Sequence, residues 1–244
     1  MASRLSGTSP SVLIVGVYLL DKPSHIRGIK TEFDKRSRWE TEQRWVALGT
    51  GAVPEDIAGV TMRKIDHTAA KFSLLNQLLT ETKLDDFEFV VVCDDDIVLP
   101  ESFLDRYLEL VVRYDLALAQ PARTHDSFID HPFVEQLDGL LARWTRFVEI
   151  GPLFSVHRRA FPIMFPFDEA SPMGWGYDFF WPTLVAKANL KMGIIDAVPV
   201  AHSLRKSVSY YQHETASREM DTFLKYRPHL SPGEAFFIVE SYAD

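Results

Sequence analysis

The sequence contains a single cysteine, Cys93, and no long apolar run. One thiol excludes an internal disulfide framework and a cysteine-based zinc site, and it suits a reducing compartment. The apolar stretch Val12 to Leu20 is shorter than the about 20 residues that span a bilayer. It also lacks the small-residue cleavage pattern of a signal peptide. We therefore expect a cytoplasmic protein without a transmembrane segment and interpret Val12 to Leu20 as a buried strand.

Positive charge is also scarce, with 26 Lys and Arg against 34 Asp and Glu and a net charge of −8. Nonspecific nucleic-acid binding needs many cations, so we exclude a nucleic-acid partner. With 46% hydrophobic residues in 244, the chain is long enough for one α/β domain with a full core. We expect a single domain over residues 1–244, with residues 1–10 flexible and residues 203–244 forming an extension that packs on or closes the site.

Alternating strand and helix patterns predict an α/β sheet, mostly parallel, with helices on both sides. Apolar, β-branched runs predict strands at Ser11–Tyr18, Arg44–Leu48, Val60–Ile65, Phe87–Cys93, Leu116–Ala119, Thr145–Ile150 and Met192–Ala201. Helical spacing of apolar residues predicts helices at Lys71–Thr80 (capped by Thr68), Pro100–Tyr114, Arg158–Met164, Tyr177–Lys191 and Thr215–Tyr226. The segment His125 to Gln136 is expected to be a loop.

Three adjacent carboxylates, Asp94, Asp95 and Asp96, follow the predicted strand Phe87–Cys93. Their mutual repulsion is relieved by a divalent cation. Asp94 and Asp96 point the same way in an extended chain, and such oxygen ligands suit Mg²⁺ or Mn²⁺ bridging to phosphates. A metal site at this strand end is the favoured interpretation, and a solvated acidic turn is the alternative.

The same local pattern also opens haloacid-dehalogenase-like phosphatases, in which the first aspartate is the nucleophile. That interpretation makes Asp94 the nucleophile of a phosphohydrolase. It is disfavoured because two or three predicted strands precede the motif, and because Ile97-Val98 stands where Gly-Thr is usual.

A second motif, Gly174-Trp-Gly-Tyr-Asp178, combines a flexible turn with an aromatic face and a carboxylate. Trp175 is suited to stacking on a sugar ring, and Asp178 opens a predicted helix whose dipole favours its ionised form. An ionised carboxylate there can take a proton from an acceptor hydroxyl. The alternative is that Trp175 is a core residue and Asp178 a helix cap.

The run Asp94-Asp-Asp-Ile-Val-Leu-Pro-Glu-Ser-Phe-Leu resembles the Asp-x-Asp region of GT-A glycosyltransferases, and the segment Gly151 to Asp178 resembles their later Trp-Gly-x-Asp/Glu turn. The pattern is also similar to a GT-A-like family of unknown function found in plants and bacteria. The resemblance implies a GT-A, Rossmann-type sheet with flanking helices. It also implies metal-dependent transfer, with inversion, from a nucleoside-diphosphate sugar, a UDP-sugar being favoured, to a glycan or other hydroxyl acceptor.

Carried over to this chain, the resemblance implies Asp94 and Asp96 as metal ligands with His202 as the third, and Asp178 as catalytic base. It places Trp175, with Gly174 and Gly176, at the sugar or acceptor pocket, and Tyr18 at the nucleotide base. Because Tyr177 replaces one of the usual acidic pair, Asp178 either is the base or only binds the acceptor.

The donor phosphates have further candidate partners. Lys71, near the start of a predicted helix, either reaches the donor phosphate or is a solvated helix lysine. Asp95 is assigned to the donor side with its neighbours, and Arg205 and Lys206 are candidates for closing over the diphosphate. His125 and His131 have no partner that the spacing defines. A non-catalytic nucleotide-sugar-binding protein is the remaining alternative.

Overall fold

A computed structural model describes residues 11–205 and 213–243 of the 244-residue chain. In this part of the chain, nine strands form one sheet in the order β3-β2-β1-β4-β7-β5-β8-β6-β9. The strands are β1 (Ser11–Leu19), β2 (Glu40–Leu48), β3 (Thr61–Ile65), β4 (Phe89–Asp94), β5 (Leu116–Arg123), β6 (Leu140–Thr145), β7 (Leu153–His157), β8 (Lys191–Val200) and β9 (Ile238–Ala243).

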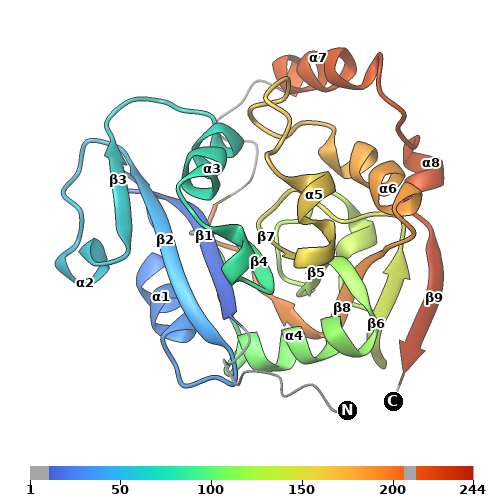
Figure 1. Cartoon of the computed structure of the whole chain (residues 1–244), viewed down its shortest axis with the longest axis horizontal. Helices are drawn as coiled ribbons and strands as arrows, with labels where there is room; N and C mark the ends of the chain where they lie inside the picture. The colour runs from blue at the N-terminus through green and yellow to red at the C-terminus, as the bar shows by residue number, and fades with distance from the viewer. Residues whose placement is uncertain (1–10, 206–212, 244) are drawn as a thin grey trace, which may run out of the picture.

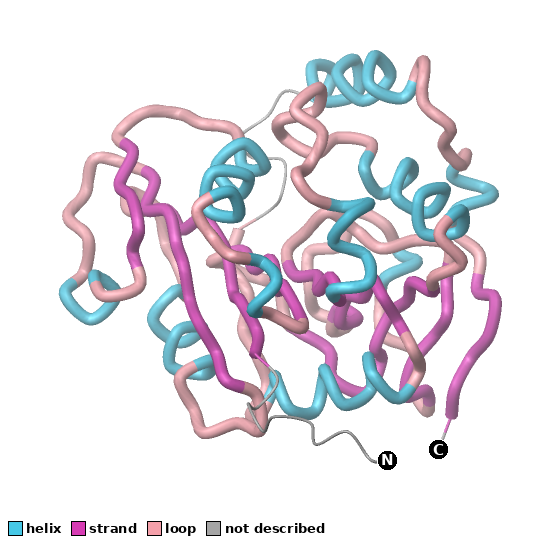
Figure 2. Tube along the Cα trace, viewed as in Figure 1, coloured by secondary structure: helices cyan, strands magenta, loops and turns pink. Residues whose placement is uncertain are grey.

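Helices flank the sheet and alternate with its strands along the chain (Figure 1). They are α1 (Ile26–Phe33), α2 (Glu55–Ala58), α3 (Lys71–Thr80), α4 (Phe103–Arg113), α5 (Phe161–Met164), α6 (Tyr177–Lys187), α7 (His213–Leu224) and α8 (Pro232–Ala235). Short 3-10 turns are η1 (Leu84–Asp86), η2 (Pro132–Val134) and η3 (Arg158–Ala160). Figure 2 shows the strands as a central layer between these helices.

The sheet is mixed, and the expectation of a mostly parallel sheet was wrong. Pairings of β1 with β2 and β4, of β2 with β3 and of β5 with β8 are parallel. Pairings of β7 with β4 and β5 and of β6 with β8 and β9 are antiparallel. Strand β7 lies between the parallel group β3-β2-β1-β4 and the parallel pair β5-β8, and it is antiparallel to both. Strand β6 lies between β8 and the edge strand β9 and is antiparallel to both.

Each face of the sheet buries its own core. On β1, Val12 and Ile14 face a core completed by α1, α2 and α4, whereas Leu13 and Val15 face a core completed by α3, α5, α6 and α7. Burial on both faces explains why the β1 sequence reads as a continuous apolar run. Because side chains pack against both faces of the sheet, the strands are rigid, and polar side chains at their ends are held in fixed positions.

Several predicted elements were placed differently by the structure. The predicted strand Thr145–Ile150 was wrong, because β6 ends at Thr145 and the hydroxyl of Thr145 accepts from the amide of Phe147 in a turn. Helix α3 begins at Lys71 as expected, but its N-cap is Ala70 without a side-chain cap, so the predicted capping by Thr68 was wrong. The predicted helix at Thr215–Tyr226 corresponds to α7. The strands and α-helices that were not predicted are β6, β7, β9, α1, α2 and α8.

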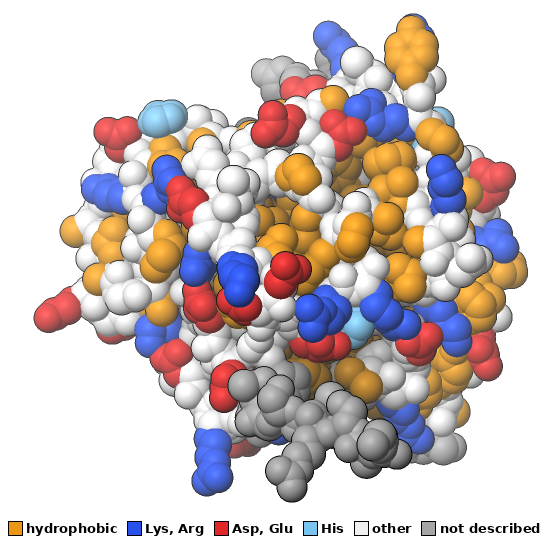
Figure 3. All heavy atoms as spheres, viewed as in Figure 1, with side chains coloured by type: hydrophobic (Ala, Val, Ile, Leu, Met, Phe, Trp, Pro, Cys, Tyr) orange, Lys and Arg blue, Asp and Glu red, His pale blue; other side chains and the backbone are white. Residues whose placement is uncertain are grey.

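No helix within the described ranges is both long and apolar enough to cross a bilayer. On the face drawn in Figure 3, positive and negative side chains are interspersed around hydrophobic ones. This face therefore carries no broad positive surface of the kind that binds nucleic acid.

Candidate functional site

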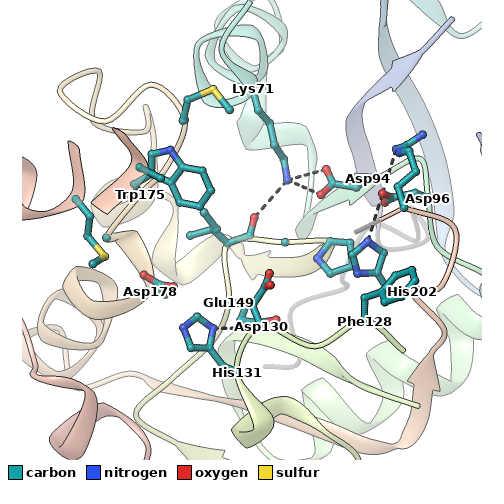
Figure 4. A pocket seen from close by; sticks show the side chains of 18 of the residues that line it. Lys71, Asp94, Asp96, Phe128, Asp130, His131, Glu149, Trp175, Asp178 and His202 are labelled. Atoms are coloured by element: carbon teal, nitrogen blue, oxygen red, sulfur yellow. Dashed lines mark hydrogen bonds and ion pairs between the residues drawn. The ribbon is translucent and has the colours of Figure 1, made fainter. Parts of the chain in front are cut away.

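One cavity of about 700 Å³ collects most of the predicted site residues. It opens at the ends of β1, β4 and β8, where the sheet meets α3, α6 and the C-terminal segment. Figure 4 shows the acidic residues Asp94 and Asp96 with His202 on one side, and Trp175 and Asp178 on the other. A cavity at the carboxyl ends of strands is the usual ligand site of α/β sheets.

Asp94, the last residue of β4, forms an ion pair with Lys71, the first residue of α3. The Lys71 Nζ lies 2.6 Å from one carboxylate oxygen of Asp94 and 2.8 Å from the other. Gly151 makes this approach possible, because a Cβ there would lie 2.9 Å from Asp94 Oδ2 and 3.2 Å from Lys71 Nζ. Burial raises the pKa of Asp94 and Lys71 opposes that rise, so the lysine helps to keep the carboxylate ionised.

Asp95 lines the same cavity and has partners within the protein. Its carboxylate accepts from the amide of Leu19 at 2.9 Å and forms an ion pair with Arg205. Its side chain is only 3% exposed. Asp95 thus connects Leu19, at the end of β1, with Arg205, in the segment after β8, and it holds Arg205 at the cavity wall.

Asp96 and His202 meet at the cavity surface. His202 Nε2 lies 3.3 Å from Asp96 Oδ2, and Arg205 Nη2 lies 3.1 Å from the same oxygen. Burial acts to raise the pKa of Asp96, but the hydrogen bond and charge of His202 and the charge of Arg205 outweigh it, so this pKa is lowered. A bridge between Val98 and Ala201 joins the chain just after the triplet to the residue before His202.

The Gly-Trp-Gly turn brings Trp175 and Gly176 to the cavity but not Gly174. Gly174 has φ +87°, and a Cβ there would lie 2.3 Å from the ring of Phe72. Gly176, with φ +91°, is the N-cap residue of α6. Gly174 therefore packs against the core under α3, and the expectation that it lines the acceptor pocket does not match its place in the structure.

Asp178 lies in the first turn of α6 and is 7% exposed. Its Oδ1 is buried and has no hydrogen-bond partner. Burial raises the pKa of Asp178 to about 7, and the nearby His131 lowers it in part. Backbone hydrogen bonds in the first turn of α6 favour the ionised form, as predicted, but the loss of solvation on burial outweighs them.

A second polar cluster lies beside Asp178 and was missed from the sequence. Arg123, at the end of β5, donates from Nη2 to Glu149 Oε2 at 2.8 Å, and His131 Nδ1 lies 2.8 Å from Glu149 Oε1. All three side chains line the cavity. Their separations in sequence, 26 and 18 residues, carry no spacing signal, although Arg123 is the last residue of a strand that begins with an apolar run.

Comparisons with known proteins address the fold. No protein-family model and no curated protein sequence matches the chain. Among solved structures, it is similar to GalNAc-T7 with UDP, GalNAc and Mn²⁺, with TM-score 0.55 and 9% identity over 86% of this chain and 47% of that one. It is also similar to S. aureus TarS 1–349 with UDP-GlcNAc, with TM-score 0.56 and 11% identity over 87% of this chain and 65% of that one.

The fold is that of the GT-A glycosyltransferases. The predicted fold class is thereby confirmed, as a mixed α/β sheet with flanking helices. The chain spans about half of the GalNAc-T7 chain and 65% of the TarS chain. At these identities the similarity concerns the fold, and the chemistry of the cavity has to be argued from its own residues.

The GalNAc-T7 structure holds Mn²⁺, and the side chains of this cavity fit a divalent ion in part. Two ligand atoms bound to one ion at about 2.1 Å lie roughly 3 Å apart. The 3.3 Å between His202 Nε2 and Asp96 Oδ2 is close to that separation. Asp94 instead faces Lys71, and within the described residues no three or more His, Cys, Asp or Glu side chains are arranged to hold a metal.

One predicted donor residue, Tyr18, lies outside the cavity lining. Tyr18 is 1% exposed, its hydroxyl lies 2.9 Å from Thr61 Oγ1, and its ring packs in the core beside α1. Its neighbours Val17 and Leu19 line the cavity instead. The alternation of side chains along β1 explains this, since residues on either side of Tyr18 face the opposite way. Lys206 lies outside the described residues.

Proposed function

We propose that this protein is a metal-dependent glycosyltransferase that moves a sugar from a nucleoside-diphosphate donor, with UDP-sugars favoured, to a hydroxyl acceptor with inversion. One observation carries the proposal. A single cavity places the Asp94–Asp96 and His202 side chains on one wall and, on the other, the buried carboxyl of Asp178, whose Oδ1 has no hydrogen-bond partner. That separation matches the two tasks of the reaction, which are holding a diphosphate and removing a proton from the acceptor.

On the donor side, Asp96 and His202 are the side chains that would hold Mn²⁺ or Mg²⁺, with Asp94 as a further ligand. Such an ion, when bound, neutralises charge that develops on the diphosphate. Lys71 and Arg205 line the same wall and are the cations available to the phosphates. Because each is paired with a carboxylate of the triplet, both are held in place before a ligand arrives.

On the acceptor side, Asp178 would accept the proton of the acceptor hydroxyl. The acceptor oxygen forms a bond to the anomeric carbon, the bond from that carbon to the diphosphate breaks, and its electron pair leaves with the diphosphate. A pKa of about 7 suits this role, since a base is most effective when its pKa lies near the working pH. Trp175 offers an aromatic face beside the reacting groups.

The GT-A fold supports the proposal without naming the substrate. The structures of GalNAc-T7 and TarS hold UDP with GalNAc and Mn²⁺, and UDP-GlcNAc, respectively. These ligands are the reason for favouring UDP-sugars here. A single domain, in which residues 203–244 pack on or close the site, belongs to the same proposal. So does a cytoplasmic location, which rests on the single cysteine.

Thermal-shift measurements with UDP, GDP and their sugars, with and without Mn²⁺, test the donor site. We expect stabilisation by one nucleotide that needs the metal and is lost in Asp96→Ala. Asp126→Ala is a matched control, because Asp126 is an aspartate outside the cavity lining. Equal shifts in the wild type and in Asp96→Ala would exclude this metal site.

Product analysis by mass spectrometry with the stabilising donor then separates the alternatives. Transfer to a hydroxyl acceptor supports the enzyme, whereas tight metal-dependent binding without turnover indicates a binding protein. Phosphate release with a phosphorylated Asp94 would instead support the phosphohydrolase. The GT-A fold gives that last alternative no support.

A further inference from the structure

The acceptor half of the cavity contains a chain of charged groups that the proposed reaction does not yet use. Glu149 has both carboxylate oxygens paired, one with Arg123 Nη2 and one with His131 Nδ1, each at 2.8 Å. Its backbone amide also donates to the side chain of Gln120. Arg123 and Glu149 are 2% and 7% exposed. Glu149 is thus held rigidly and presents a negative charge to His131.

The imidazole of His131 is confined by aromatic rings. Its centroid lies 5.1 Å from the ring of Phe147, 5.5 Å from that of Phe236 and 6.2 Å from that of Phe179. These contacts and the bond to Glu149 fix the plane of the ring. Helix α6 carries both Phe179 and Asp178, so the element that packs on the imidazole also carries the carboxyl.

Asp178 is the group that this cluster faces. Three buried side-chain polar atoms of the described residues lack a hydrogen-bond partner, and two of them, Asp178 Oδ1 and Arg123 Nη1, belong to side chains that line this cavity. The charges of His131 and Glu149 shift the pKa of Asp178. The charges of Glu149, Asp178 and Asp130 shift the pKa of His131. Figure 4 shows Asp178 and His131 next to each other on the same side of the cavity.

We propose that Asp178, His131 and Glu149 act as one acid–base unit, in which the imidazolium of His131, held by Glu149, keeps Asp178 ionised and ready to accept the acceptor's proton. The inference rests on the proposed function and adds His131 as a positioning residue. Before transfer, the unit carries two negative charges and one positive charge. After transfer, the proton is on Asp178 and the imidazolium remains paired with Glu149.

The charges define the direction of each effect. Burial raises the pKa of Asp178, and the charge of His131 lowers it. The pKa of His131 is raised because Glu149, by hydrogen bond and charge, and the charges of Asp178 and Asp130 outweigh burial. Removing the imidazole therefore raises the pKa of Asp178 further, and removing the Asp178 charge lowers the pKa of His131. Linkage requires the two shifts to be equal in size.

Carboxyl and imidazole NMR titrations measure both shifts without any donor or turnover. Asp178 is followed in ¹³C-aspartate-labelled protein, with its signal assigned by Asp178→Asn. We expect His131→Asn to move the Asp178 midpoint up by about one pH unit. We expect Asp178→Asn to move the His131 midpoint down by the same amount. The second measurement keeps the imidazole, so it tests the coupling between Asp178 and His131 even if His131→Asn does not fold.

His125→Asn is the matched control. His125 also pairs with a glutamate, Glu135 at 2.7 Å, but it is exposed and does not line the cavity. This variant should leave the Asp178 midpoint unchanged. An Asp178 midpoint that is the same in His131→Asn and in the wild type, or a His131 midpoint that Asp178→Asn does not move, would overturn the unit.

The pH dependence of transfer connects the unit to the reaction. With the donor identified, His131→Asn should shift the acidic limb of the kcat profile to higher pH by the shift that NMR gives for Asp178. A lower kcat without a shifted limb would assign His131 a purely structural role. Coupled titrations together with no transfer from any donor would remove the proposed function while leaving the charge coupling established.

Discussion

At the scale of single residues, a buried carboxyl with an unpaired oxygen costs folding free energy when it ionises. Asp178 is such a group, with a pKa raised by burial to about 7 from the ordinary 3.8. Between these two values the folded state binds more protons than the unfolded state. The unfolding free energy contributed by Asp178 therefore falls as pH rises through this window, and the full cost is present above pH 7.

Asp178→Asn should remove this cost together with the base. We expect the variant to be more stable than the wild type at pH 8, on the order of 2–4 kcal/mol, and to show no such gain at pH 4. Thermal or urea unfolding at the two pH values checks the difference. Transfer activity should be lost while metal-dependent donor binding remains. A gain of the same size at both pH values would contradict the raised pKa.

A second residue-scale prediction concerns Arg143 and Asp196. Arg143 Nε and Nη2 donate to the two oxygens of Asp196 at 2.9 and 2.8 Å, and the side chains are 2% and 0% exposed. Asp196→Ala leaves a buried cation without its partner, so we expect a loss of about 3–5 kcal/mol in urea unfolding. Asp56→Ala, which breaks the exposed pair with Arg27, should cost less than about 1 kcal/mol. Similar losses in both variants would show that burial does not decide the value of these pairs.

At the scale of elements, the Gly-Trp-Gly turn links the core to the cavity. Gly174→Ala places a Cβ 2.3 Å from Phe72 at φ +87°, so we expect a loss of about 2–4 kcal/mol and weaker acceptor binding, as Trp175 moves with the turn. Gly28→Ala is the control, because a Cβ there meets nothing within 4 Å in helix α1. It should stabilise by about 0.5–1 kcal/mol. Equal effects of the two would show that the turn is not strained by a side chain.

The elements that were predicted and those that were missed differ in how they are buried. Strands β1, β4 and β8 were found because strands covered on both faces read as apolar runs. Strand β9 lies at the sheet edge and is largely exposed, with the charged Glu240 in its middle, so its sequence has no apolar run. Helix α1 buries only Ile26, Ile29 and Phe33 within a charged stretch.

The candidate site divides in the same way. Lys71, Asp94 and Asp96 were predicted because strand ends and helix starts are visible in the sequence, and His202 was implied by the resemblance to GT-A glycosyltransferases. The structure places all four at one cavity. The Arg123–Glu149–His131 cluster was not predicted, because it joins a strand end to two loops by contacts that only folding creates. The segment after β6 packs Phe147 against His131 and brings Glu149 next to both Arg123 and His131.

At the scale of the whole molecule, β7 joins two halves of the sheet. It pairs with β4, which belongs to the group β1 to β4, and with β5, which pairs with β8. The cavity also depends on both halves, since Asp94 ends β4 whereas His202 follows β8. Two independently folding units would not keep these side chains in register.

We therefore expect the chain to unfold as one cooperative unit. Hydrogen exchange followed by mass spectrometry in increasing urea should give peptides from β1 and from β8 that exchange with the same free energy and the same dependence on urea. Far-UV circular dichroism and tryptophan fluorescence should share that midpoint. Peptides from the exposed edge strand β9 should exchange earlier, by local opening. If β8 lost protection at a lower urea concentration than β1, the halves would be separate units, and the proposed single domain would have to be divided at β7.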